Sequence, residues 1–266
     1  MLAAGSVLLG CAGARVYFIA ASNLAGGYGM GGAALLSPYP FEYAMCGAVL
    51  GVLLAACLSA AAAHIRLSCV LDALALPGLC MIALARISEV FSDFGWGQVL
   101  SQGGFFPLAV RDLYGQWHGS VFFLEALCAL GALAYAARVE AGSAKRFATA
   151  LLWFSVAQVL CESLRAETIR WGFVRVQQVQ CAVFALALLC AAAYRRRMTG
   201  RQAALRIGVF AACVAVAGGM EFALDKWPWP DWLCYAVMAA ALGILGWNVQ
   251  DVIRPAKGRT CAAKTA

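Results

Sequence analysis

Eight predominantly apolar stretches, separated by short polar segments, run through the chain from one end to the other. They cover residues 4–22, 43–63, 68–88, 119–137, 147–164, 177–194, 205–222 and 231–248. About 20 apolar residues suffice for a helix to cross the hydrocarbon core of a bilayer, where a helix satisfies its own backbone hydrogen bonds. No segment has the alternating pattern of transmembrane β-strands. The sequence therefore predicts an all-α, polytopic transmembrane helical bundle of about eight spans.

The composition excludes a soluble globular domain, because 64% of the residues are hydrophobic and only 12% are charged. The 12 cysteines contain no CxxC pair, and most lie within the apolar stretches. Cysteine at such positions behaves as a small apolar residue. We therefore expect no metal site and no cofactor.

Lysine and arginine residues are concentrated in alternate loops of the predicted bundle. The basic loops contain Arg66; Arg138, Lys145 and Arg146; Arg195, Arg196, Arg197, Arg201 and Arg206; and Arg254, Lys257, Arg259 and Lys264. Basic loops stay on the cytoplasmic side of a membrane, so both termini are predicted to be cytoplasmic. The net charge of +7 comes largely from these flanks. It indicates insertion next to anionic lipid, and we expect no nucleic acid partner.

One loop breaks this pattern. Arg165, Arg170 and Arg175 lie between two apolar stretches, on the side predicted to face outward. Arginines concentrated there need a reason, since positive charge favours the cytoplasmic side. An anionic ligand is the most economical reason, and the nearest plentiful anion in a membrane is a phospholipid head group.

Ionisable residues also lie inside the predicted spans or at their ends: Arg15, Asp72, Arg86, Glu89, Glu125, Glu162, Arg165 and Glu221. Such residues are costly in a membrane and normally mark function or paired structure. The pairs Arg86/Glu89 and Glu162/Arg165 are each three residues apart, which places each pair on one helix face. Two readings stay open: internal ion pairs, or residues that converge on one cavity open to the outer leaflet.

Asp72 and Glu221 have simpler expectations. Asp72 is near Arg66, and we expect it to be a structural cap or ion-pair partner; for Glu221, the evident partner is Lys226. The outer loop 89–118 is rich in aromatic residues and glycine. It is consistent either with a lid beside the membrane or with an ordinary belt of interfacial aromatic residues.

The order of several segments resembles the prolipoprotein diacylglyceryl transferases of bacterial inner membranes. The sequence ARISEVFSDFGWG at 85–97 is similar to the family signature GRxGNFxNxExWG, with Arg86, Trp96 and Gly97 in register. Further likenesses are GARVY at 13–17 to GARxGY, CGAVLG at 46–51 to HGGLIG, WHGSVFFLEAL at 117–127 to RHPSQLYEAL, CESLR at 161–165 to VEFFR, and 177–197 to the final MGQxLS span.

This resemblance implies a diacylglyceryl transferase-like fold in a bacterial inner membrane. The family moves the diacylglyceryl group of phosphatidylglycerol to the thiol of a lipobox cysteine. Phosphatidylglycerol, or another anionic phospholipid, and a prolipoprotein lipobox peptide are therefore the expected partners. Arg86 and Arg165 are predicted to bind the phosphate, because guanidinium binds it through two hydrogen bonds and stays charged. The other residues predicted to bind substrate are Arg15, Glu125, Glu162, Trp96 and Gly97, and Glu162 and Glu125 are expected to orient the arginines.

Several positions depart from the family pattern. Cys46 replaces the family histidine, Glu89 and Ser92 replace two asparagines, and Phe94 replaces an acidic residue. Glu89, Cys46 and His118 are the remaining predicted catalytic residues. Cys46 is either a base or nucleophile beside an arginine or a packed thiol, and His118 is either the replacement for the lost histidine or an interface residue.

The resemblance also suggests a division of the chain. Residues 1–200 form the transferase-like membrane domain, in which the first family span is missing; residues 201–250 add two transmembrane helices; and 251–266 are a basic cytoplasmic tail. Two functions follow from the preserved arginines and the lost histidine. The first is a phosphatidylglycerol-dependent transferase, impaired or retargeted, and the second is a non-catalytic phospholipid- or lipoprotein-binding relative.

Overall fold

The computed structural model describes residues 2–24, 43–92, 95–101, 103–171 and 174–254. Its helices are α1 (Leu2–Leu24), α2 (Met45–Ala62), α3 (Leu67–Ser88), α4 (Val121–Ala137), α5 (Lys145–Leu164), α6 (Val176–Arg195), α7 (Gly200–Lys226) and α8 (Asp231–Ile253), with a short 3-10 helix η2 (Glu89–Phe91). Most of the predicted outer loop 23–42, Phe94 of the family-like segment and the basic tail from 255 onward lie outside the described residues.

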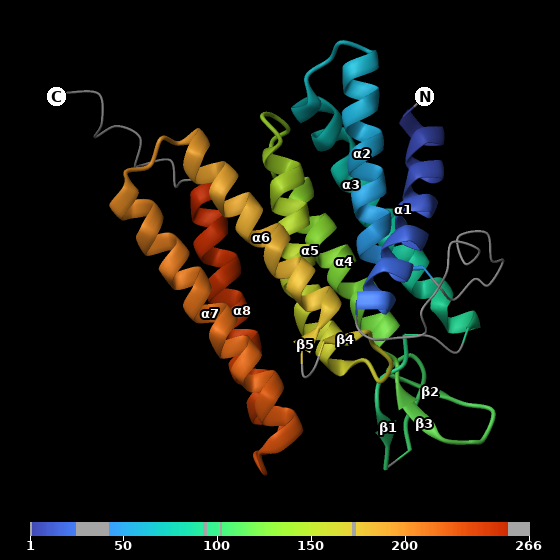
Figure 1. The fold of residues 1–266 in the computed structure, drawn as a ribbon. Coiled ribbons are helices and arrows are strands. Elements are labelled where there is room, and N and C mark those ends of the chain that lie inside the picture. Colours follow the sequence, from blue (N-terminus) through green and yellow to red (C-terminus); the bar gives the residue numbers. More distant parts are fainter. Residues whose placement is uncertain (1, 25–42, 93–94, 102, 172–173, 255–266) are drawn as a thin grey trace.

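The predicted spans match these helices closely. Among the described residues, seven helices are long and apolar enough to cross a membrane, and α4 is a shorter apolar helix of 17 residues. The prediction of an all-α, multi-pass membrane protein is confirmed. The start of α1 and the end of α8 lie at the same end of the bundle, at the top of Figure 1.

Helices α1 and α2 pack with their backbones almost in contact, and glycine makes this possible. A Cβ atom at Gly51 would lie 1.9 Å from the backbone oxygen of Leu9, and one at Gly47 would lie 2.3 Å from that of Gly13. Gly47 and Gly51 are four residues apart on α2, the spacing of the GxxxG motif of membrane helix pairs. The HGGLIG-like segment of the sequence is thus a helix-packing surface.

Two apolar cores hold the remaining helices together. One core joins α3, α4 and α5 through small side chains such as Ala75, Ala129 and Ala150. The other joins α5 to α6, α7 and α8 and contains Leu152, Leu189 and Met238. The two helices after residue 200 therefore share a core with α5.

Asp72 fixes the start of α5 from the side of α3. Its Oδ1 accepts a hydrogen bond from the backbone N–H of Phe147 at 3.0 Å, and its Oδ2 accepts one from Gly142 at 2.6 Å. The first amides of a helix have no hydrogen-bond acceptor within that helix. Here the Asp72 side chain on α3 is the acceptor for amides at the start of α5 and in the loop before it. The prediction that Asp72 is a structural cap is confirmed, with α5 in place of Arg66 as its partner.

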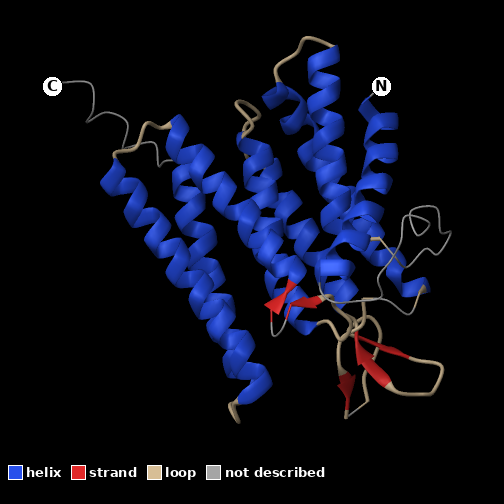
Figure 2. Ribbon diagram, in the orientation of Figure 1, coloured by secondary structure: helices blue, strands red, loops and turns tan. Residues whose placement is uncertain are grey.

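All described strands lie at the end of the bundle opposite the chain ends (Figure 2). Strands β1 (Val99–Leu100), β3 (Trp117–Gly119) and β2 (Ala109–Arg111) form an antiparallel sheet in that order, and β4 (Arg170–Trp171) pairs with β5 (Val174–Arg175). Phe105 and Phe106, in the loop between β1 and β2, are exposed. Phe91 before β1 and Tyr114 between β2 and β3 are exposed as well. Outward-facing aromatic side chains favour the interfacial belt over a lid that packs on the helices.

Candidate functional site

Three helix ends meet at the strand end of the bundle and bring four charged side chains together. The end of α3 with η2 supplies Arg86 and Glu89, the first turns of α4 supply Glu125, and Arg165 directly follows α5. Ion pairs connect all four residues, although the whole of α4 lies between the two arginines in the sequence. We call these four residues the arginine cluster.

Glu125 is the buried centre of the arginine cluster, with a side chain that is 0% exposed. Its carboxylate accepts hydrogen bonds from Nε and Nη2 of Arg165 at 3.0 and 2.7 Å, the two-pronged geometry that a guanidinium favours. Nε of Arg86 lies 2.8 Å from Oε2 of Glu125, although its N–H bond is not directed at that oxygen. Glu125 thus holds Arg165 by two hydrogen bonds and pairs with Arg86 by charge.

Gln158 of α5 completes the surroundings of Glu125. It donates from Nε2 to Oε1 of Glu125 at 2.9 Å, and both side chains are buried. Gln158 was not among the predicted site residues, which inside the spans were mainly ionisable ones. The available signal was its position four residues before Glu162, on the same face of an apolar helix.

Glu89 bridges the two guanidinium groups with a single carboxylate. Its Oε1 accepts from Nη1 of Arg86, and its Oε2 lies 3.1 Å from Nη2 of Arg165. The Glu89 side chain is 20% exposed, whereas that of Glu125 is inaccessible. The ion pair expected from the three-residue spacing of Arg86 and Glu89 is therefore present, and Glu89 is the accessible acid of the cluster.

The corresponding expectation for Glu162 and Arg165 is wrong. Arg165 directly follows the last turn of α5, where the ends of α3 and α4 lie within reach of its side chain. Its side chain reaches Glu89 and Glu125 instead. The spacing rule identifies neighbours on one helix, but here acids from two neighbouring elements bind the guanidinium instead.

Glu162 is fully buried, and neither of its carboxyl oxygens has a hydrogen-bond partner among the described residues. The Nη2 atom of Arg86 is also buried without a hydrogen-bond partner in that part of the chain. Unsatisfied polar atoms are costly in an apolar interior. Glu162 was also expected to orient the arginines, but it accepts no hydrogen bond from either of them; Glu89 and Glu125 make the ion pairs. The carboxyl oxygens of Glu162 and Nη2 of Arg86 are therefore available to a further polar group.

Glycines of the family-like segment pack closely against the arginine cluster. Gly95 has φ +75°, and a Cβ atom there would lie 2.0 Å from Oε2 of Glu89. Gly97 forms an antiparallel bridge with Arg165, and the Trp96 carbonyl accepts from the Ala166 N–H at 3.0 Å. The backbone from Gly95 to Gly97 is thereby held against the arginine that follows α5. These contacts place the predicted residues Trp96 and Gly97 at the site.

His118 lies in the outer sheet, next to this segment. Its Nδ1 is 3.4 Å from the Gly97 carbonyl oxygen, and its Nε2 is 3.3 Å from Oδ2 of Asp112. The centre of its ring lies 5.0 Å from that of Trp96, with the two planes tilted by 36°. Burial opposes ionisation of Asp112, but its hydrogen bonds from the Gln116 amide and His118 lower the pKa of the Asp112 carboxyl. His118 thus connects the Gly97 backbone with Asp112, in the turn between β2 and β3.

A second buried network lies beside the arginine cluster, around Arg175. Arg175 donates from Nε to Glu221 at 2.8 Å, from Nη1 to the Arg165 carbonyl at 2.7 Å and from Nη2 to the Ser163 carbonyl at 3.1 Å. Glu221 also accepts from the Ser163 hydroxyl. The expectation that Lys226 is the partner of Glu221 is therefore wrong, since the neighbouring α7 brings Glu221 to β5. Arg175 positions the backbone of Arg165 and is buried, while Arg170 is exposed.

The other two predicted site residues, Arg15 and Cys46, make their contacts outside the arginine cluster. Arg15 is buried in α1, with its Cζ 5.5 Å from the centre of the Tyr43 ring. Cys46 is buried at the start of α2; its Sγ lies 4.0 Å from Oε1 of Gln177, and its carbonyl accepts from Gln180. These contacts agree with the packed-thiol alternative for Cys46.

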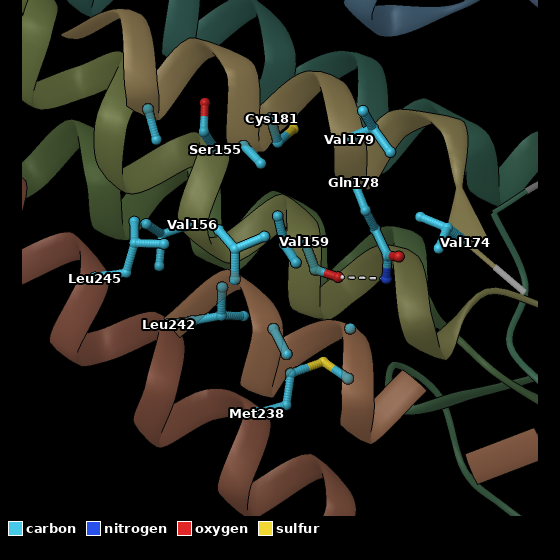
Figure 3. A pocket seen from close by; sticks show the side chains of 15 residues that line it. Ser155, Val156, Val159, Val174, Gln178, Val179, Cys181, Met238, Leu242 and Leu245 are labelled. Carbon is cyan, nitrogen blue, oxygen red and sulfur yellow. Dashed lines mark hydrogen bonds between the residues drawn. The ribbon is translucent and has the colours of Figure 1, made fainter. Parts of the chain in front are cut away.

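A pocket of about 100 Å³ lies between α5, α6, α7 and α8 (Figure 3). It is lined mostly by apolar side chains of α5, α6, α7 and α8, such as Val156, Leu242 and Met238. Gln178 turns its amide to the Val159 carbonyl at 3.2 Å, as the dashed line shows. No member of the arginine cluster lines this pocket, and its apolar walls do not suit a phosphate.

No group of three or more His, Cys, Asp or Glu residues in the described segments is arranged to hold a metal ion. Comparison of the chain with models of protein families, with curated proteins and with solved structures gives no match. The function proposed below therefore rests on the geometry of the arginine cluster and on the resemblance of its segments.

Proposed function

We propose that the arginine cluster binds the phosphate of phosphatidylglycerol, and that the protein transfers the diacylglyceryl group of this lipid to a lipoprotein cysteine. The setting proposed is a bacterial inner membrane, with both termini cytoplasmic and the cluster facing the outer leaflet. The observation that carries the proposal is the Glu89 carboxylate, which bridges Arg86 and Arg165 as a phosphate would.

The two acids of the cluster differ in a way that supports this exchange. Glu125 is inaccessible and is held by Gln158 as well as by the arginines, so it stays in place. Glu89 is partly exposed and sits in a one-turn 3-10 helix. An anion that displaces Glu89 meets two preoriented guanidinium groups, which favour phosphate through paired, charge-assisted hydrogen bonds.

The reaction needs both an anion site and a proton acceptor. The thiolate sulfur of the lipobox cysteine attacks the glyceryl carbon, a carbon–sulfur bond forms, and the carbon–oxygen bond to the phosphate breaks. Glycerol phosphate leaves with the electron pair, and the thiol proton passes to a base. Arginines beside the phosphate stabilise the charge that develops on the leaving group, and their positive field lowers the pKa of a nearby thiol.

Replacing Glu89 with asparagine is expected to strengthen the binding of phosphatidylglycerol. The change removes a competing carboxylate and restores the residue found at this position in the family signature. We expect an affinity gain of about tenfold, the effect of roughly 1.4 kcal/mol, in titrations of the detergent-solubilised protein with labelled lipid. Glu140→Gln, at an exposed site in the loop before α5, is the matched control. Weaker binding by the Glu89→Asn variant would show that Glu89 is not a stand-in for phosphate.

Replacing Arg86 or Arg165 with alanine is expected to weaken phosphatidylglycerol binding more than Arg170→Ala does. A hydrogen bond to a charged group contributes about 1.5–3 kcal/mol, which corresponds to a loss of roughly tenfold or more. Arg170 is exposed and is the control for the loss of one positive charge in the same region. Each variant is first checked for a monodisperse gel-filtration peak. Equal affinities in all three would leave the arginines as pairing residues only.

The second candidate, a non-catalytic lipid-binding protein, is favoured by the contacts of His118 and Cys46. Both ring nitrogens of His118 face acceptors in the outer sheet, and the Cys46 thiol faces Gln177. Neither contact brings a base to the arginine cluster. A transferase with this site depends on thiolate that forms without a dedicated base.

We accordingly expect slow transfer with a rate that rises towards pH 9, because a free thiol has a pKa of about 8.5. The measurement is release of glycerol phosphate from phosphatidylglycerol in the presence of a lipobox peptide. A pH-independent rate would instead indicate a base already in place, with His118→Gln as the variant that identifies it. Absence of release at every pH, with lipid binding intact, would establish the binding protein.

A further inference from the structure

A concave site lies at the opposite end of the bundle from the arginine cluster. The loop before α5, the last turns of α6 and the end of α8 enclose a pocket of about 550 Å³. Its inner wall is apolar and includes Leu71, Phe147, Leu188 and Val252. At this end the helices stop being apolar, since α5 begins at Lys145 and α6 ends at Arg195. The pocket therefore lies where a bilayer changes from hydrocarbon to head groups.

The pocket is lined by three cationic residues: Lys145, Arg195 and Arg196. No acidic residue is among the described residues that line it. Two acids that adjoin lining residues in the sequence have other partners: Asp72, next to Leu71, accepts from two backbone amides, and Asp251, next to Val252, pairs with Arg206. The charge that faces the pocket is consequently positive.

One hydrogen bond shapes the cationic rim. Arg195 donates from Nη1 to the Ser143 carbonyl at 2.7 Å and so ties the end of α6 to the loop before α5. A guanidinium has several N–H groups, so this bond leaves Arg195 with donors for an anion. Burial lowers the pKa of the Arg196 guanidinium, Asp251 opposes the shift and Arg206 adds to it. Lys145, Arg195 and Arg196 are all exposed, so each can reach an anion at the mouth of the pocket.

We propose that this pocket binds an anionic phospholipid from the leaflet at this end of the bundle. The phosphate lies among the three cations, and an acyl chain lies against the apolar wall. Basic pockets between membrane helices at a head-group boundary suit such lipids. The first turn of α5 contributes Lys145 to the lining of the pocket. This site is independent of the arginine cluster and of any transfer reaction.

The test is photo-crosslinking of the full chain, in detergent, with phosphatidylglycerol that carries a diazirine in an acyl chain. We expect adducts on peptides that contain residues 143–148 and 188–196. The double variant Arg195→Gln/Arg196→Gln should reduce these adducts at least tenfold. The variant Arg197→Gln/Arg201→Gln removes the same charge from exposed residues that do not line the pocket, and it should retain them.

Because Arg195 also supports the loop before α5, Lys145→Gln provides a second, milder variant, which should lower the adduct yield without loss of the monodisperse peak. Equal labelling by diazirine-bearing phosphatidylcholine would overturn the selectivity for an anionic head group. Full competition by soluble glycerol phosphate would show a site for free phosphate in place of a lipid. Labelling that both double variants reduce equally would show attraction by net charge alone.

Discussion

Replacing Glu125 with alanine is expected to destabilise the folded protein by about 3–5 kcal/mol, the cost of removing one partner from a buried ion pair. Glu125 has an inaccessible side chain and faces both Arg86 and Arg165. Without it, two guanidinium groups at the end of the helical bundle share the carboxylate of Glu89. Typical native stabilities are about 5–15 kcal/mol, so this single change removes a large part of the total.

The measurement is the apparent melting temperature in detergent, together with the fraction of protein in the monodisperse gel-filtration peak. Glu89→Ala is the matched control, because Glu89 contacts the same two arginines but is 20% exposed. Water can replace part of its interaction, so the loss of stability should be clearly smaller. If the two variants melted at the same temperature, the burial of Glu125 would not be what makes it important.

Replacing Gly51 with leucine is expected to separate α1 from α2 and to cost ~3 kcal/mol or more, since extra atoms in a tightly packed interface force the backbone to move. A Cβ atom alone would lie 1.9 Å from the Leu9 carbonyl oxygen. This oxygen belongs to the helix backbone and cannot turn aside as a side chain would. The helices can accommodate leucine only by moving apart, which breaks the close contact that Gly47 and Gly13 also form.

Gly131→Leu in α4 is the control, because a Cβ atom at Gly131 meets no other atom within 4 Å. It adds the same side chain to a membrane helix and should leave the melting temperature nearly unchanged. The prediction fails if Gly51→Leu melts like Gly131→Leu. A partial effect of Gly51→Ala, between the two, would support the same steric cause.

Glu125 and Glu89 have different roles in the arginine cluster. Both acids contact the same two arginines, but they differ in exposure. The buried Glu125 holds the arginines in place, whereas the partly exposed Glu89 occupies the position proposed for a bridging anion. A Glu89→Asn variant that binds lipid more tightly, together with a Glu125→Ala variant that does not fold stably, would separate these roles by experiment.

The helical spans follow from the sequence alone. An apolar stretch of about 20 residues has one stable way to cross hydrocarbon, so the bounds of α3, predicted as 68–88 and observed as Leu67–Ser88, required no tertiary information. Local spacing also sufficed for the Arg86–Glu89 pair, because both residues lie within one continuous turn. The sequence likewise predicted that Asp72 is a structural cap, but it did not predict that the start of α5 is its partner.

The partners between helices were decided by the tertiary structure. Arg165 binds Glu125 and Glu89, and Arg175 binds Glu221, because helix rotation and the point at which α5 ends set which side chains face each other. Spacing along one helix contains no information about the rotation of its neighbours. The same holds for Gly51, whose closeness to Leu9 depends on how α1 crosses α2. The sequence specifies which charges enter the membrane, and packing selects the charge that neutralises each one.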